Sequence, residues 1–216
     1  MSELLLKGVL AYLLGSIIGS LLIAHLIGGV DIRTLGSGNA GATNALRVVG
    51  RKVALWVLLI DVAKGWIATG RLATWVIPGI PAAPTGLEAW CVPVCGLAVM
   101  VGHVYPVWFG FRGGKGVATL LGAVLGISAW LLLPMILTWL VAVILFSFVG
   151  LASILGAVAL AAWVAVTNSG APLLTFATLS AVLILFTHRS NVARMRAGTE
   201  SRARRLWLFG AHRGEN

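Results

Sequence analysis

The chain has 216 residues, of which 59% are hydrophobic and only 10% charged, with a mean hydropathy of +1.00. A water-soluble fold of this length could not cover so much apolar surface with so few charges, so the composition excludes an ordinary soluble domain. The formal net charge of +10 does not call for a nucleic-acid partner, because basic residues in the cytoplasmic loops of a membrane protein explain most of it.

Long apolar stretches follow one another along the chain, and each is typical of a membrane-spanning helix. They predict an all-α, polytopic integral membrane bundle of seven transmembrane helices. Five is the alternative, because the last four spans are short and could merge in two pairs. A single domain, 1–216, is expected, with a short basic tail at 189–216. The expected spans are 4–29, 53–77, 87–109, 117–132, 134–149, 151–167 and 172–187.

The basic residues predict the orientation, since short loops rich in Lys and Arg stay in the cytoplasm. Thirteen of the sixteen basic residues fall on one predicted face, whereas Lys7 and Arg71 fall on the other. The amino terminus is therefore expected outside and the carboxyl terminus in the cytoplasm. The thirteen are Arg33, Arg47, Arg51, Lys52, Arg112, Lys115, Arg189, Arg194, Arg196, Arg202, Arg204, Arg205 and Arg213.

The first polar segment, residues 30–52, contains GSGNAGATN and then Arg47. Its closely spaced glycines leave backbone amides uncovered, and small polar side chains surround them, a combination that suits an oxyanion. The glycines also fit G-x-G-x-x-G, but that dinucleotide-binding pattern needs a preceding strand, and a membrane span is predicted here. A flexible interhelical loop is the plainer alternative. The candidate phosphate-binding residues are Ser37, Gly38, Asn39, Gly41, Thr43 and Asn44.

Inside the second predicted span, Asp61 and Lys64 are spaced to pair across one helical turn. Ionisable groups at that depth usually face a bundle interior. Whether this pair binds a substrate or only each other is left open. Cys91 and Cys95 lack the clustered His or Cys partners of a metal site, so no metal is predicted and packing is their default role.

The second polar segment, residues 102–119, reads GHVYPVWFGFRGGKGVAT. Lys115 follows Gly113 and Gly114 and precedes a predicted helix, whose amino terminus would attract phosphate. The segment is not a Walker loop, because Gly116 stands where that loop needs Ser or Thr. Further candidates are His103 and Arg112, although the positive-inside bias alone could account for the basic residues. The aromatic residues Tyr105, Trp108 and Phe109 are interpreted as part of an interfacial belt.

The third polar segment, residues 188–200, reads HRSNVARMRAGTE and leaves the last predicted span. His188 and Asn191 are three residues apart and would share one face of a helix. An imidazole at the membrane boundary can donate to phosphate or move a proton. The basic residues Arg189, Arg194 and Arg196 are explained equally well as anchors to anionic lipid.

In this order, the three polar segments resemble the motifs of the bacterial acyl-phosphate:glycerol-3-phosphate acyltransferase family, the PlsY type, over most of the chain. The matching stretches are GSGNAGATN, GHVYPVWFGFRGGKGVAT and HRSNVARMRAGTE. One departure concerns the turn between the fifth and sixth spans, which in the family is commonly basic and contains Ser. Here it reads Phe148, Val149 and Gly150, so only Ser153 is kept as a candidate from that turn.

The resemblance implies an enzyme of the bacterial cytoplasmic (inner) membrane with its active site on the cytoplasmic side. It would transfer a fatty acyl group from acyl-phosphate to the sn-1 hydroxyl of glycerol 3-phosphate, giving lysophosphatidic acid and phosphate without a cofactor. It implies catalytic roles for Lys115, His188 and Arg47 in one pocket, with Asn191 helping to position glycerol 3-phosphate. The two substrates and the lipid bilayer are the implied partners, and docking of a soluble acyl-phosphate-producing enzyme is left open.

Other glycerolipid acyltransferases use H-x-x-x-x-D, in which a carboxylate orients a histidine base. That pattern is missing, because the residues five places after His103 and His188 are Trp108 and Ala193. Acyl-phosphate has a good leaving group, so a single-step transfer without a covalent intermediate is expected, with His188 or a substrate phosphate taking the hydroxyl proton. The competing interpretations are a small transporter or channel for anionic solutes and a non-catalytic membrane scaffold.

Overall fold

The computed structural model describes residues 3–26 and 29–203. Within these ranges all regular secondary structure is helical and no strand is present, which confirms the all-α prediction. The chain divides into two compact units, Met1–Ala129 (unit 1) and Trp130–Asn216 (unit 2). That the chain works as one domain stays a prediction. Of the expected basic tail, Arg204, Arg205 and Arg213 lie outside the described residues.

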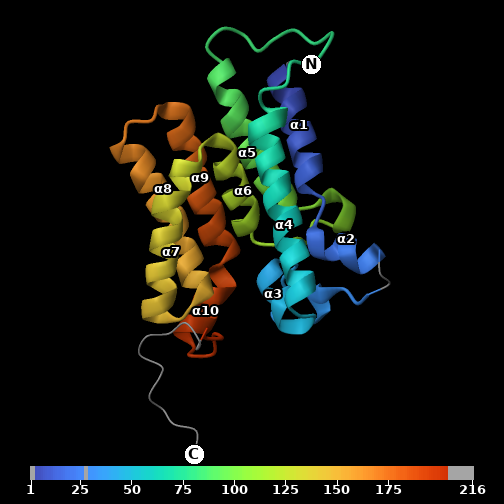
Figure 1. Cartoon of the computed structure of the whole chain (residues 1–216), viewed down its shortest axis with the longest axis vertical. Helices are drawn as coiled ribbons and strands as arrows, with labels where there is room; N and C mark the ends of the chain where they lie inside the picture. The colour runs from blue at the N-terminus through green and yellow to red at the C-terminus, as the bar shows by residue number, and fades with distance from the viewer. Residues whose placement is uncertain (1–2, 27–28, 204–216) are drawn as a thin grey trace, which may run out of the picture. The chain divides into compact units, whose positions relative to one another are not determined.

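Unit 1 contains the first two polar segments and the helices between them. Helix α1 packs along α5, and α4 packs along α6, as Figure 1 shows. Helix α4 continues without interruption into η2, a π-helical turn. In chain order the elements are α1 (Glu3–Gly15), α2 (Gly19–Leu26), η1 (Ile32–Thr34), α3 (Ala42–Val48), α4 (Arg51–Ile67), η2 (Ala68–Leu72), η3 (Glu88–Trp90), α5 (Cys91–Val104), η4 (Val107–Phe109) and α6 (Val117–Ile127).

Unit 2 contains the third polar segment at the end of a helical hairpin series. Helix α8 packs against both α7 and α9, and the short α10 contacts α8 and α9 (Figure 1). The turn η5 (Ala129–Leu131) leads into this unit. Its helices are α7 (Leu132–Phe146), α8 (Val149–Val166), α9 (Ala171–Thr187) and α10 (Arg189–Arg196).

Among the described residues, four helical stretches are long and apolar enough to cross a membrane, and bent helix pairs raise the number to as many as six. Large apolar side chains cover their outer surfaces; Trp130 and Val166, for example, are each 80% exposed. Such exposure suits a lipid environment and not water. The chain is therefore an integral membrane helix bundle. The four stretches are Arg51–Leu72, Glu88–Phe109, Ala129–Phe146 and Val149–Val166.

Three of the expected spans differ from straight membrane helices. The first is broken after Gly15, and its two parts meet at 53°. The last predicted span is α9, which bends by 50° into α10. The expected fourth span is the 11-residue α6, which at about 1.5 Å per residue is roughly half as long as a hydrocarbon core is thick.

Glycines let the helices of unit 1 approach one another closely. A Cβ atom added to Gly122 of α6 would overlap the main chain of Val62 in α4. A Cβ atom on Gly65 of α4 would likewise overlap the main chain of Thr119 at the start of α6. Because lipid gives little hydrophobic drive for helix association, such close backbone packing is a principal source of stability in a membrane.

Candidate functional site

Asn44 organises the first polar segment. Its side chain is buried, and its Oδ1 atom accepts a hydrogen bond from the Ser37 amide at 2.9 Å. Its Nδ2 atom donates to the carbonyls of Ile32, at 2.9 Å, and Leu35, at 3.0 Å. These three bonds fold the glycine-rich loop back on α3. The structure thus gives Asn44 a role in holding the loop, while its contact with a substrate stays a prediction.

The loop leaves most of its other candidate residues accessible. Arg47, in the last turn of α3, is exposed. Gly38 has a φ of 71°, a left-handed conformation that glycine adopts at no steric cost. Ser20 of α2 donates to the Ala40 carbonyl at 2.5 Å and so seats the loop on α2. The accessible or partly accessible candidates are Ser37, Gly38, Asn39, Gly41, Thr43 and Arg47.

Arg33 joins the first polar segment to the second, a role that sequence reasoning did not assign to it. Its guanidinium pairs with Asp31 at 2.7 Å. The same group donates to the carbonyls of Phe109, at 2.9 Å, and Arg112, at 2.8 Å. Nothing in the local pattern marks these partners, because they lie more than seventy residues away along the chain.

The second polar segment turns back on the end of α5. The Gly113 amide donates to the Val104 carbonyl at 3.1 Å, and the Gly114 amide donates to the His103 carbonyl at 3.0 Å. A Cβ atom on Gly114 would overlap the imidazole of His103 at Nε2. The two glycines are therefore needed for this turn, which delivers the partly buried Lys115 to the start of α6.

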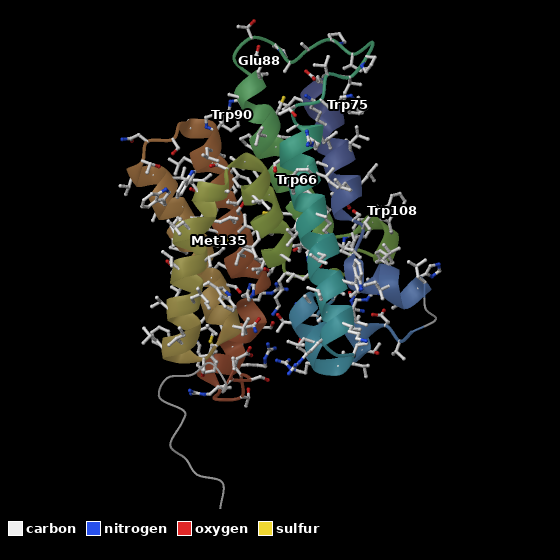
Figure 2. All side chains as sticks on the ribbon, in the orientation of Figure 1. Trp66, Trp75, Glu88, Trp90, Trp108 and Met135 are labelled. Carbon is white, nitrogen blue, oxygen red and sulfur yellow. The ribbon has the colours of Figure 1, made fainter. Side chains whose placement is uncertain are left out.

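The aromatic part of the second polar segment rests on the end of α1. The Tyr12 hydroxyl donates to the Tyr105 carbonyl at 2.8 Å, and the Trp108 indole donates to the Leu13 carbonyl at 3.4 Å. Trp108, labelled in Figure 2, is 60% exposed, as expected for a side chain of an interfacial belt. Arg112 is also exposed, and its carbonyl accepts the bond from Arg33 described above.

Asp61 and Lys64 form the predicted ion pair across one turn of α4, with 3.0 Å between Lys64 Nζ and Asp61 Oδ1. The structure adds a third member, His103, whose Nδ1 atom lies 2.8 Å from Lys64 Nζ and 3.4 Å from Asp61 Oδ1. All three side chains are buried. Asp61 and Lys64 therefore contact His103 as well as each other, and His103 in turn contacts the Gly113–Gly114 turn.

In unit 2, His188 lies at the bend between α9 and α10 and is buried. Its Nδ1 atom is 2.8 Å from the Ile184 carbonyl. A carbonyl oxygen can only accept, so Nδ1 carries the hydrogen. In the neutral ring the lone pair is then on Nε2, and this atom can take up a proton.

Asn191, the other predicted residue of this segment, is held by Glu200, which sequence reasoning did not single out. Asn191 Nδ2 donates to Glu200 Oε1 at 2.6 Å, and Arg194 pairs with Glu200 Oε2 at 2.6 Å. A Cβ atom on Gly150 would come within 3.0 Å of the Asn191 side chain. Gly150, at the start of α8, thus leaves the space that Asn191 occupies.

Ser153 is buried in α8 and makes local contacts. Its hydroxyl donates to the Val149 carbonyl at 2.9 Å and accepts from the Trp139 indole at 3.4 Å. The bond from Trp139 joins α7 to α8, whereas the bond to Val149 lies within α8. A substrate role for Ser153 stays a prediction, as does the meeting of His188 with Arg47 and Lys115 in one pocket.

The Arg33 link leads to a testable prediction. We expect Arg33→Lys to lower, by about tenfold, kcat/KM of the acyl transfer that the resemblance implies. An ammonium group cannot reproduce the guanidinium fork that reaches Asp31 and two carbonyls together. Steady-state rates of the purified variant check this result. A matched control is Arg51→Lys at the exposed start of α4, which should leave the rates unchanged.

The pH dependence of the variant provides a second check. The hydrogen bonds from Arg33 lower the pKa of the Asp31 carboxyl below its ordinary value. The ion pair therefore stabilises the fold above the unfolded-state pKa of about 4, and this contribution is lost as the pH falls through the lowered folded-state pKa. The loss of kcat/KM in Arg33→Lys should accordingly be the same at every pH tested near neutrality. A loss that disappears at one of these pH values would contradict the prediction.

Comparison with known proteins shows relatives along nearly the whole chain. A family model described as glycerol-3-phosphate acyltransferase matches residues 5–198. The chain is 40% identical to a glycerol-3-phosphate acyltransferase of Coxiella burnetii, with 91% of this chain and 96% of the relative covered. It is 43% identical to one of Geotalea daltonii, with 88% and 93% covered.

Two crystal structures of PlsY (YgiH), an integral membrane glycerol 3-phosphate acyltransferase, share this fold. The glycerol 3-phosphate form matches with a TM-score of 0.83 and 38% identity, covering 93% of this chain and 96% of that chain. The lysophosphatidic acid form matches with a TM-score of 0.81 and 37% identity, covering 93% and 95%.

Proposed function

The chain belongs to the glycerol-3-phosphate acyltransferase family, and we propose that it transfers its acyl group in one direct displacement. The enzyme moves a fatty acyl group from acyl-phosphate to the sn-1 hydroxyl of glycerol 3-phosphate, giving lysophosphatidic acid and phosphate. The bond from the acyl carbon to the phosphate oxygen breaks, and the hydroxyl oxygen forms the new ester bond. The observation that carries the proposal is the glycine turn that packs against His103 and leads to Lys115 at the start of α6, tied to the first polar segment through Arg33.

The charges of the site suit two phosphorylated substrates. Lys115 and Arg47 are assigned to neutralise charge, because negative charge moves onto the leaving phosphate as the acyl carbon is attacked. The amides and hydroxyl groups of the glycine-rich loop bind phosphate or headgroup oxygens. Holding the two anions close together also supplies much of the rate enhancement, since a bimolecular reaction becomes effectively unimolecular. The loop residues assigned to bind phosphate or headgroup oxygens are Ser37, Asn39, Thr43 and Asn44.

His188 and Asn191 are assigned to glycerol 3-phosphate. The His188 ring donates through Nδ1 to the Ile184 carbonyl, so its Nε2 atom has the lone pair that can take the hydroxyl proton. A phosphate oxygen of a substrate is the alternative acceptor. The bond between Asn191 and Glu200 fixes the amide of Asn191 for its role in positioning the substrate.

The proposal includes the topology. Seven membrane segments place the amino terminus outside and the polar segments on the cytoplasmic side of a bacterial inner membrane. The concentration of basic residues in and around the polar segments supports this orientation. Figure 2 shows Trp75, Glu88 and Trp90 at the opposite end of unit 1, where α1 begins. This end carries Lys7 and Arg71 and is assigned to the outer face.

One assay tests the reaction and its single-step course together. Purified protein in detergent receives acyl-phosphate and glycerol 3-phosphate, and phosphate and lysophosphatidic acid are measured. We expect the two products in equal amounts, with no initial burst and no acylated protein after acid quenching, because no covalent intermediate forms. An acylated side chain detected by mass spectrometry would contradict direct displacement. In a parallel experiment with the protein reconstituted into liposomes, uptake of either substrate without product formation would favour a transporter.

A further inference from the structure

We propose that Asp61, Lys64 and His103 form a positioning network that fixes the Gly113–Gly114 turn and, through it, the ammonium group of Lys115. This inference rests on the proposed function of Lys115. None of the three side chains is more than 3% exposed. Buried charges are costly in a membrane unless they are paired, yet pairing alone would need only Asp61 and Lys64. The added contact with His103 extends the pair to the Gly113–Gly114 turn.

The first part of the network holds the break in the first membrane segment. Lys64 Nζ donates to the carbonyls of Gly15, at 2.9 Å, and Ile17, at 2.7 Å, where α1 ends. On the other side of the break, the Gly19 amide that begins α2 donates to Asp61 Oδ1 at 3.4 Å. Each charge thus binds the helix end of opposite polarity, where backbone groups lack helical partners.

The second part of the network orients His103. The His103 Nδ1 atom lies 2.8 Å from Lys64 Nζ and 3.4 Å from Asp61 Oδ1, so the buried pair holds the ring by this atom. Nε2 is the atom that faces Gly114, where a Cβ atom would overlap it. The ring therefore packs against and supports the turn directly before Lys115.

Together these contacts connect the helix break to the Gly113–Gly114 turn. Asp61 holds Lys64, Lys64 orients His103, and His103 supports the Gly113–Gly114 turn. A catalytic group is held in its productive geometry by such surrounding contacts, and a displacement of about 1 Å can cost on the order of 100-fold in rate. We therefore expect the network to control turnover without touching the reacting atoms.

The test replaces the buried pair by neutral side chains of similar size. We expect the double variant Asp61→Asn/Lys64→Met to lower kcat/KM by about 100-fold, with kcat falling more than KM rises. The matched control is Glu3→Gln/Lys7→Met, which removes another buried carboxylate–lysine pair of unit 1, joined at 2.7 Å in α1. This control should stay within about threefold of the unchanged enzyme, since it lies far along α1 from the helix break.

Two readouts separate positioning from general destabilisation. The buried thiols of Cys91 and Cys95 react with a fluorescent maleimide only when unit 1 opens, so thermal labelling measures its stability. We expect both pair variants to lose similar stability but only Asp61→Asn/Lys64→Met to lose turnover. Adding Lys115→Ala to that variant should cost much less than it does in the unchanged enzyme, because coupled residues are not additive. Fully multiplicative losses, or equal turnover losses in both pair variants, would overturn the proposal.

If the pair variant does not fold, His103→Asn tests the same network. The asparagine amide keeps an acceptor for Lys64 but leaves the space against Gly114 empty. We expect a loss of about tenfold in kcat/KM, and Gly114→Ala should then do less harm in the His103→Asn background than alone, because the overlap with the ring is gone. If His103→Asn turns over as fast as the protein without substitutions, the proposal is wrong. If the protein without substitutions shows no acyl transfer, the proposed function is contradicted instead.

Discussion

Replacing Lys115 by alanine is expected to lower kcat/KM about 100- to 1000-fold while the protein remains folded, the range typical for losing one group that stabilises transition-state charge. Lys115 follows the glycine turn and is only partly buried, so its side chain contributes little to the packing of the bundle. The loss should appear mainly in kcat, because charge on the leaving phosphate develops during the transfer. Steady-state phosphate release over a range of both substrates measures it.

The matched control is Lys52→Ala. Lys52 is an exposed lysine at the start of α4, the last residue of the first polar segment, and it is not assigned to bind a substrate. We expect its rates to differ from those of the unchanged enzyme by less than about threefold, since exposed charges on a membrane protein act mainly through the lipid surface. Full activity in Lys115→Ala would refute the assignment of charge neutralisation to this residue.

Replacing Gly122 by alanine is expected to destabilise unit 1 strongly. The added methyl group would overlap the backbone of Val62, which cannot move unless α4 and α6 separate. Overpacking of this kind costs about 1–3 kcal/mol and sometimes more. We expect a large fall in the temperature at which Cys91 and Cys95 become reactive, measured by thermal labelling in detergent. Activity should fall with it, because the turn that bears Lys115 leads directly into α6.

Gly8→Ala provides the comparison. At Gly8 an added Cβ atom would meet a side-chain methyl group of Val94 at 3.2 Å, which can give way by a few tenths of an ångström. Alanine also favours a helix over glycine by about 1 kcal/mol, so the net effect on stability should be small. Equal melting temperatures for Gly122→Ala and Gly8→Ala would show that close packing of α4 and α6 is not a main source of stability.

The composition and the three polar segments determined the membrane class, the helical fold and the family. These properties depend on features that run along the chain. Long apolar stretches with few charges are typical of membrane-spanning helices, and the three motifs occur in a characteristic order. The Asp61–Lys64 pair was predictable for the same reason, because residues three apart on a helix lie on one face whatever surrounds them.

The tertiary structure alone decided which distant residues join these local features. His103 meets Lys64 from 39 residues away, and Arg33 reaches carbonyls of the second polar segment. The break after Gly15 is likewise held by side chains of α4, so the apolar stretch by itself predicted an unbroken span. Sequence spacing defines neighbours within one helix, whereas contacts between helices depend on where glycines allow close packing and where buried polar groups must find partners.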